Sequence, residues 1–298
     1  MNTYVLVADS PAVSELVASA AKLGRPVVAV VVGPESVAKA VAAPGVDKVL
    51  WVSEAAGQAA EAFAPAVADL VAADPGVVFA GRKPAERVLL GAVAARLGAP
   101  VVAGATAVAA EGGTTVVTHG TYGGIAVATV AYDGPVVLVG DGGGALAGGG
   151  TAAIEAVAAT PGPISVVSLA PSTVEAVDLA GAARVVSVGR GLKSADDLPL
   201  LAGLAKALGA ELGCSRPVAE SLEWLPKDHY VGISGQHIAP DFYLMVGISG
   251  QIQHMGGCRG AKLIVCINTD KDAPVMHQAD YVLQGDLYDL VPAITAAV

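Results

Sequence analysis

Short apolar runs rich in β-branched residues alternate with longer alanine-rich segments through the first hundred residues. The runs predict strands at 4–8, 27–32, 48–52, 77–80 and 100–104, and the segments between them predict helices near 11–22, 36–42, 57–73 and 84–97. Continuous apolar runs are typical of parallel strands that are covered on both faces. This rhythm predicts a parallel sheet with helices packed on it.

The pattern changes after Thr114, where the runs TTVVTHG, GGIAVATVAY and PVVLVG are separated by turn residues. Strands joined by tight turns pair in opposite directions. We therefore expect an antiparallel extension of the first sheet.

A glycine-rich segment follows at 140–150. Its first residues, Gly140-Asp141-Gly142, come after a predicted strand and formally fit a dinucleotide fingerprint. The fingerprint needs a helix start after it, but Leu146, Ala147 and three more glycines come next, and no helix favours that composition. A flexible surface loop is therefore favoured over a phosphate site.

A second series of strands and helices begins after a segment with Pro and Ser punctuation at 160–183. This composition indicates a junction, so we predict two domains, 1–172 and 173–298. In the second domain the expected strands are 184–188, 210–215, 244–249, 262–268 and 281–284, and the expected helices lie near 196–208, near 251–257 and from Asp286. The fold class predicted for the whole chain is α/β, with a nucleotide-binding type of domain at each end.

Composition narrows the function classes. Apolar residues make up 54% of the 298 residues and the net charge is −10, which disfavours nucleic acid as a partner. Cys214, Cys258 and Cys266 have no CxxC spacing, so we expect reduced thiols and no metal site. No apolar run reaches the ~20 residues of a bilayer span, and the first residues lack a basic flank, so a soluble, cytoplasmic protein without membrane insertion is expected.

Several strands of the second domain are followed by a small or polar residue and a donor. RVVSV leads into Gly189-Arg190-Gly191, ELGC into Ser215-Arg216, LMVGI into Ser249-Gly250, and KLIVCI into Asn268. Ligands of parallel sheets lie beyond the carboxyl ends of the strands. These ends together predict a binding site for an anionic ligand.

Each of these features also has a simpler explanation. Arg190 and Arg216 could be solvated surface charges, and His254 could be an ordinary helix histidine. The stretch GISGQ occurs twice, at 232–236 and at 247–251. Either copy could offer backbone N–H and hydroxyl donors to an anion, or the recurrence could be chance. A nucleophile elbow is disfavoured because glutamine stands where G-x-S-x-G needs its second glycine.

A family resemblance is carried by the runs GRGLKSADDLPLLAGLAKALGAELGCSRPVAE, YVGISG, YLMVGISGQIQHMGG and VCINTDKDAPVMHQADYVLQGDLYDLVPAI. Together these runs closely resemble the FAD domain of electron-transfer flavoprotein α subunits. It is similar above all to the FixB-like branch, where SRPVAE, YVGIS and GISGQIQHM recur in this order. The resemblance implies a C-terminal Rossmann-like FAD-binding domain and an N-terminal domain that packs on a β subunit.

The resemblance also implies roles for individual residues. Arg190 would meet the phosphate region of FAD, and Ser215 and Arg216 would lie beside the isoalloxazine. Ser249 and Gly250 would hold the pyrophosphate or ribityl chain with Gln253 close by, and His254 would face flavin O2. Asn268 and Asp286 would bind the adenosine side. The cofactor-binding set implied in this way is Gly189, Arg190, Gly191, Ser215, Arg216, Ile233, Ser234, Gly235, Gly247, Ser249, Gly250, Gln253, His254, Asn268 and Asp286.

Arg216, Ser234 and His254 would tune the flavin. A cation and a hydrogen-bond donor favour the negative charge that one-electron reduction places on the N1/O2 edge. Many family members read Q-T-G-K where this chain reads Ile233-Ser234-Gly235-Gln236, and a lysine is common where this chain has Thr269. The first change is shared with the FixB-like branch and implies a flavin potential unlike that of the fatty acid β-oxidation type.

The function implied is that of an electron carrier in an obligate heterodimer with a β subunit. Its donor would be an acyl-CoA dehydrogenase-type flavoenzyme, and its acceptor a quinone oxidoreductase or a Fix-like chain, with or without electron bifurcation. The β subunit would hold AMP or a second FAD. Two other hypotheses remain, a non-redox adenine-nucleotide sensor and a hydrolase that uses Ser249 with His254.

Overall fold

The computed structural model describes residues 2–8, 10–53, 57–148, 150, 152–168 and 177–298. These residues form two compact units, Met1–Ala170 and Pro171–Val298. The domain boundary predicted between 172 and 173 lies outside the described residues. Each unit is considered by itself.

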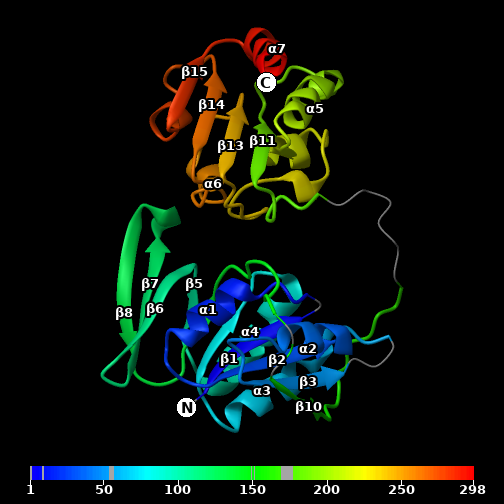
Figure 1. Ribbon diagram of the computed structural model, residues 1–298, viewed down its shortest axis with the longest axis vertical. Coiled ribbons are helices and arrows are strands. Elements are labelled where there is room, and N and C mark those ends of the chain that lie inside the picture. The colour runs from blue at the N-terminus through cyan, green and yellow to red at the C-terminus, as the bar shows by residue number, and fades with distance from the viewer. Residues whose placement is uncertain (1, 9, 54–56, 149, 151, 169–176) are drawn as a thin grey trace. The chain divides into compact units, whose positions relative to one another are not determined.

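The first unit is built on a seven-stranded parallel sheet with the order β10-β3-β2-β1-β4-β9-β5 (Figure 1). The strands are β1 Thr3–Ala8, β2 Val27–Gly33, β3 Lys48–Ser53, β4 Val77–Ala80, β5 Val101–Ala103, β9 Val137–Val139 and β10 Ala153–Val157. The strands predicted in the first hundred residues all take part in it. The predicted parallel sheet is therefore confirmed.

Helices cover both faces of this sheet because successive strand residues point to opposite sides. Val5 and Val7 pack with α1 and α2 on one face, and Tyr4 and Leu6 pack with η1, α3 and α4 on the other. These elements are α1 Ser14–Ala21, α2 Glu35–Val41, η1 Ala60–Phe63, α3 Ala64–Ala72 and α4 Pro84–Leu97. A strand buried on both faces must be apolar at every position, which is why the strand pattern is continuous rather than alternating.

The antiparallel part forms a separate sheet of three strands, β6 Ala105–Glu111, β7 Thr114–Thr121 and β8 Ala126–Tyr132. The run PVVLVG was expected to belong to it, and that detail is wrong. Its residues form β9, which pairs parallel with both β4 and β5 inside the main sheet. Fully buried Val137 and Leu138 need covering on both faces, which the main sheet provides.

The described glycines after β9 hold the start of α1. The carbonyls of Gly142 and Gly144 accept hydrogen bonds from the backbone N–H groups of Glu15 and Ser14 at 3.1 and 3.0 Å. The N–H of Gly144 donates to Ser14 Oγ at 3.0 Å. Strand β10 follows, and no described residue between it and β9 is helical, so the dinucleotide fingerprint is not formed here.

The second unit is a five-stranded parallel sheet with the order β12-β11-β13-β14-β15 (Figure 1). The strands are β11 Arg184–Val188, β12 Glu211–Cys214, β13 Phe242–Val246, β14 Ile264–Asn268 and β15 Tyr281–Gln284. The chain first steps from β11 to β12 on one side and then crosses to β13 on the other. A topological switch point therefore lies between β11 and β13, and ligands of such sheets bind at that point.

Helical elements again cover both faces. α5 and α7 pack on one face of the second sheet, and α6 with the loop before β13 packs on the other. The elements are η3 Ala195–Asp197, α5 Leu198–Ala207, the π-helical turn η4 Pro217–Ser221, η5 Lys227–His229, α6 Ile252–Met255, η6 Pro274–His277 and α7 Leu287–Ala297. The predicted α/β fold class is thus confirmed in both units.

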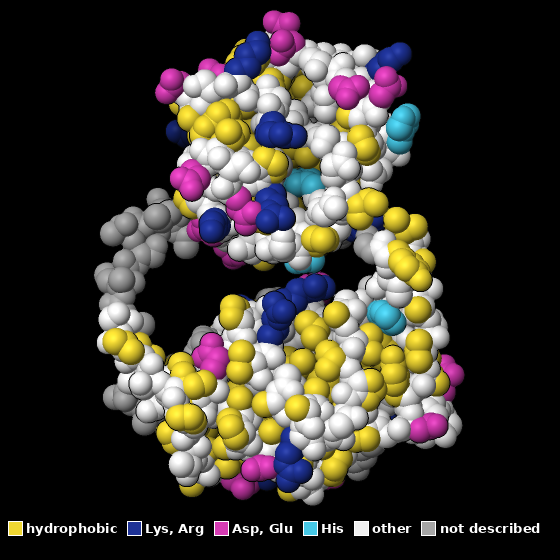
Figure 2. Space-filling model, turned by 180° about the vertical axis from the view of Figure 1, so that it is seen from behind, with side chains coloured by type: hydrophobic (Ala, Val, Ile, Leu, Met, Phe, Trp, Pro, Cys, Tyr) yellow, Lys and Arg dark blue, Asp and Glu magenta, His cyan; other side chains and the backbone are white. Residues whose placement is uncertain are grey.

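The surface differs between the units. Figure 2 shows basic and acidic side chains interspersed on the visible face of the second unit, and apolar side chains over much of the visible face of the first. Exposed large apolar residues of the first unit include Val101, Tyr122, Ile125 and Val127. Among the described residues, no helix combines the length and apolar character that a bilayer crossing requires.

Candidate functional site

Two glycine loops meet at the switch point of the second sheet. The N–H of Gly189 donates to Val246 O at 2.9 Å and the N–H of Gly191 donates to Gly247 O at 3.1 Å. A side chain on Gly189 would overlap the Gly247 carbonyl, and a Cβ on Gly191 would lie 2.7 Å from Gly247 Cα. Gly247 itself has a φ of 62°, which favours glycine. The sequence therefore uses glycine here to bring two backbone loops together where parallel sheets bind ligands.

Two predicted cationic residues differ in their surroundings. Arg190 is exposed between the two glycines, and no described residue pairs with its guanidinium. Arg216 is also exposed, but its Nε lies 2.5 Å from Glu220 Oε2, and this carboxylate raises the pKa of Arg216. Ser215, directly before it, is buried and its N–H donates to Val188 O at 2.9 Å. Arg190 is thus the uncompensated positive charge at the end of β11.

The first GISGQ stretch lies against α6 and the turn after it, which follow the second copy. The N–H of Ile233 in the first copy donates to Gln253 O in α6, directly after the second copy, at 2.8 Å. A Cβ on Gly257 would lie 2.5 Å from Gly232 Cα, so glycine is needed for this approach as well. In the first copy, Ser234 Oγ is 3.0 Å from the hydroxyl of Tyr230. The first copy therefore packs on the short helix that follows the second copy.

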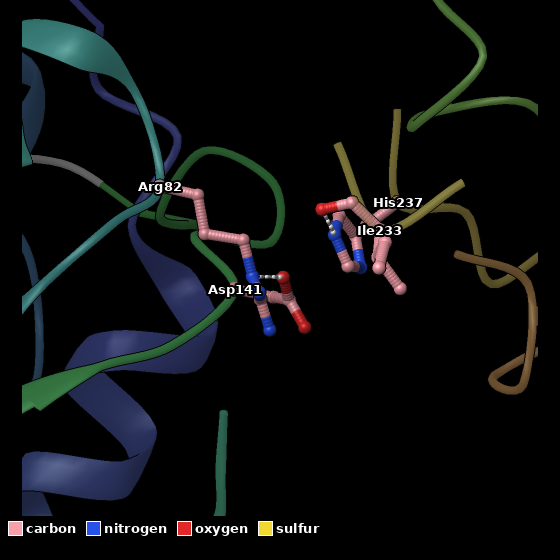
Figure 3. Close-up of polar contacts among 4 residues, drawn as sticks. All are labelled: Arg82, Asp141, Ile233 and His237. Carbon is pink, nitrogen blue, oxygen red and sulfur yellow. Dashed lines mark hydrogen bonds and ion pairs between the residues drawn. The ribbon is translucent and has the colours of Figure 1, made fainter. Parts of the chain in front are cut away.

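The first GISGQ loop also contacts a histidine that the sequence did not single out. His237 Nε2 lies 3.4 Å from Ile233 O (Figure 3). Figure 3 draws a second pair, which belongs to the first unit, where Arg82 Nε lies 2.7 Å from Asp141 Oδ1. That ion pair joins the loops after β4 and β9, and no site residue predicted from the sequence takes part in it.

The backbone of the second GISGQ loop is held by hydrogen bonds, whereas polar side chains in the loop and just after it are exposed. Ser249 O accepts the Val275 N–H at 3.0 Å, and Gly250 O accepts from Gln278 Nε2 at 3.1 Å. Gly250 has a φ of 73°, and a Cβ there would meet Val275 at 2.6 Å. The Ser249 hydroxyl and the Gln253 amide are exposed, and neither bonds a described residue. These two polar groups are free to bind a ligand.

His254 in α6 is almost fully buried, with 7% of its surface exposed. Its Nε2 lies 2.7 Å from the hydroxyl of Tyr243 in β13, and the two rings are stacked with centroids 6.1 Å apart. Its Nδ1 is buried, and no side chain of the described residues bonds it. Burial lowers the pKa of His254 to about 4, against the opposing effect of the Val231 carbonyl. The ring is therefore neutral near pH 7.

The side chains of Asn268 and Asp286 form hydrogen bonds with backbone groups of the second unit. Asn268 Nδ2 donates to Ile248 O at 3.0 Å, and its Oδ1 accepts the Asp270 N–H at 3.0 Å, so it clamps β14 to the second GISGQ loop. Asp286 Oδ1 accepts the Tyr288 N–H at 2.9 Å and forms the N-cap of α7. Asn268 lies at the carboxyl end of β14, as predicted, and Asp286 follows β15, but both side chains hold backbone groups.

The hydrolase hypothesis does not fit this geometry. A serine nucleophile needs a base within hydrogen-bond reach. The Ser249 hydroxyl is exposed without a described partner, whereas Nε2 of the buried His254 is bonded to Tyr243. Sequence reasoning missed Tyr243 because it lies inside an apolar strand, where a tyrosine gives no signal of a polar contact.

Two family models match the chain. The model described as the electron transfer flavoprotein domain matches residues 8–159, and the one described as the electron transfer flavoprotein FAD-binding domain matches residues 178–259. The electron transfer flavoprotein subunit YdiR of Escherichia coli (strain K12) is 36% identical over 310 residues, covering 99% of this chain and 97% of YdiR. Protein FixB of Salmonella typhimurium is 37% identical over 252 residues, covering 80% of this chain and 79% of that protein.

Proposed function

The chain belongs to the electron transfer flavoprotein α-subunit family, in its FixB-like branch, and from this premise we propose that its second unit binds one FAD and passes electrons between partner proteins. The observation that carries the proposal is the meeting of two glycine loops at the switch point, with the unpaired guanidinium of Arg190 in one loop and the free hydroxyl of Ser249 in the other. Both features belong to the second unit.

The residues present fit a flavin dinucleotide. Gly189, Gly191 and Gly247 leave bare backbone at the switch point, where a diphosphate can approach closely. Arg190 supplies an unpaired positive charge in the same loop, and the Ser249 hydroxyl adds a free donor.

Each residue has a distinct role in this proposal. Arg190 and the Gly247–Gly250 backbone bind the phosphates, Ser249 and Gln253 bind the chain between phosphate and ring, and His254 orients the pyrimidine edge. Arg216 and Ser234 lie beside the ring system. The bound flavin supplies the one-electron chemistry, and the protein positions it and sets its electrostatic surroundings.

The partner is proposed to be an electron-transfer flavoprotein β subunit that holds AMP or a second FAD. Exposed apolar side chains of the first unit, such as Tyr122, Ile125 and Val127, favour a protein interface there, since exposed apolar patches commonly mark one. An acyl-CoA dehydrogenase-type flavoenzyme is proposed as donor and a quinone oxidoreductase or Fix-like chain as acceptor. Bifurcation would require the second FAD.

The test is the flavin content of the complex purified through a tag on this chain. We expect FAD, identified by its visible spectrum and by acid release, together with a co-purifying second subunit. One FAD per α chain indicates a simple carrier and two indicate the bifurcating type. A colourless protein that purifies alone and releases only an adenine nucleotide would contradict the proposal and favour a nucleotide sensor.

A further inference from the structure

Tyr288, in the first turn of α7, joins three segments at the carboxyl edge of the second sheet. Its hydroxyl accepts the backbone N–H of Lys193 at 2.9 Å and donates to Asp197 Oδ2 at 2.6 Å. Lys193 belongs to the loop that follows β11, and Asp197 directly precedes α5. The Lys193 ammonium also lies over the Tyr288 ring, 4.6 Å from its centroid. One side chain therefore ties the loop after β11 to the starts of two helices.

Chemistry fixes the direction of both hydrogen bonds. A backbone N–H can only donate, an ionised carboxylate can only accept, and a tyrosine hydroxyl can do both at once. Desolvation and the hydrogen bond to Asp197 raise the pKa of Tyr288, against the opposing effect of the Lys193 N–H, so the hydroxyl keeps its proton near pH 7. A phenylalanine would keep the ring and lose both bonds. Tyr288→Phe therefore isolates what the hydroxyl does.

The loop that Tyr288 holds is the one that carries Arg190. The glycines on either side of Arg190 donate hydrogen bonds to backbone carbonyls at the end of β13, and these bonds attach the loop to the sheet. The N–H of Lys193, three residues after Arg190, is bonded instead to the Tyr288 hydroxyl, which attaches the loop to the helices. The backbone around the exposed Arg190 is thus held from two sides.

We propose that Tyr288 is a positioning residue for Arg190: by holding the backbone of the loop after β11, it presents the guanidinium to the anionic part of the ligand. The proposal rests on the proposed function for the identity of that ligand as FAD. A loop that is already ordered loses less conformational freedom on binding, so the affinity rises. Arg190 needs this support because no carboxylate of the described residues holds its side chain, whereas Glu220 pairs with Arg216.

The hold on the loop is measured without flavin, by hydrogen exchange of backbone amides in the ¹⁵N-labelled full chain. We expect the Lys193 amide to be protected in the wild type. In Tyr288→Phe it should exchange about tenfold faster or more, while the Gly191 amide, bonded to Gly247 O, keeps its protection. The matched control is Tyr281→Phe, which removes an exposed hydroxyl that bonds no described residue and should leave both amides unchanged.

An unprotected Lys193 amide in the wild type would overturn the proposal even if the phenylalanine variant failed to fold. Unchanged exchange of that amide in folded Tyr288→Phe would overturn it as well.

The effect on the ligand is measured by titrating FAD into the flavin-free full chain. We expect Tyr288→Phe to bind FAD roughly fivefold more weakly, which corresponds to about 1 kcal/mol, the contribution of one oriented hydrogen bond. In an Arg190→Ala background, where no guanidinium is left to position, the same change should weaken binding by less than about twofold. Tyr281→Phe should bind FAD as the wild type does.

A purely structural role of Tyr288 predicts the same loss of affinity with and without Arg190, and that result would overturn the proposal. Equal affinity of the wild type and Tyr288→Phe would also overturn it. A wild type that binds no FAD contradicts the proposed function instead, and hydrogen exchange then still decides whether Tyr288 holds the loop.

Discussion

At the scale of single residues, the candidate site depends on glycines, which have no side chain, and on one buried histidine. Gly189, Gly191 and Gly247 allow two loops to touch, and any side chain at the first two would overlap the facing backbone. His254 is neutral near pH 7 because burial lowers the pKa of its ring. Two predictions follow from these residues.

Gly189→Ala should destabilise the second unit by about 1–3 kcal/mol, because the added methyl overlaps the Gly247 carbonyl and forces the loops apart. FAD should be lost at the same time. The matched control is Gly203→Ala in α5, where nothing lies within 4 Å of the new Cβ, and that change should stabilise by up to about 1 kcal/mol. Urea unfolding and flavin content measure both; equal behaviour of the two variants would show that the loops are not closely packed.

The pH dependence of stability should carry the signature of His254. Its pKa is about 4 in the folded chain and about 6.5 when unfolded, so between these values the unfolded chain binds more protons. Stability is therefore fully present above about pH 6.5 and falls, by up to about 3 kcal/mol, as the pH drops toward 4. Urea unfolding of the flavin-free wild type and of His254→Gln across this range isolates the effect, since other titrating groups contribute to both. Parallel pH profiles would contradict a buried neutral histidine.

At the scale of elements, the carboxyl ends of the parallel strands collect the polar residues, but not all of these residues face a ligand. Asn268, at the end of β14, and Asp286, after β15, hold backbone groups. The same residue types can hold a loop, cap a helix or contact a ligand, because each of these uses needs a short polar side chain that bonds nearby backbone or ligand groups.

Asp286→Ala should lower stability by about 1 kcal/mol through loss of the α7 N-cap, and Asp286→Asn should not, because asparagine caps equally well. Thermal unfolding and FAD titration of both variants separate a cap from a cofactor ligand. If both variants lose FAD affinity while stability stays constant, Asp286 binds the adenosine side, as the family resemblance implies.

At the scale of the whole molecule, each unit has its own hydrophobic core. The buried clusters on the two faces of the first sheet draw only on the first unit, and those of the second sheet draw only on the second. A unit with a complete core and a complete sheet is expected to fold independently. All residues of the proposed FAD site also lie in the second unit.

The fragment 171–298 should therefore fold cooperatively and bind FAD on its own. Circular dichroism with urea unfolding tests the first part, and FAD titration tests the second. The fragment 1–170 is the control and should bind no FAD. A folded second fragment without FAD affinity would mean that the first unit or the partner subunit contributes ligands to the site.

The sequence by itself determined the kinds of elements and the class of fold. Short runs of β-branched residues, separated by longer alanine-rich segments, indicate strands covered on both faces, and this local pattern is enough to recognise them. The glycine-flanked strand ends likewise indicated the edge of the sheet at which the ligand site is proposed. Family membership was readable too, because it depends on ordered motifs such as SRPVAE and GISGQIQHM.

Only the tertiary structure decided which strands pair and which polar side chains already have an ion-pair or hydrogen-bond partner within the chain. Strand pairing depends on partners far apart in the chain, and so Val137–Val139 joined the parallel sheet rather than the antiparallel one. Arg216 is paired with Glu220 whereas Arg190 is unpaired, a difference that their flanking residues do not reveal. The link between Tyr243 and His254 arises because β13 and α6 pack face to face, and hydrogen-bond geometry in a core is a property of that packing.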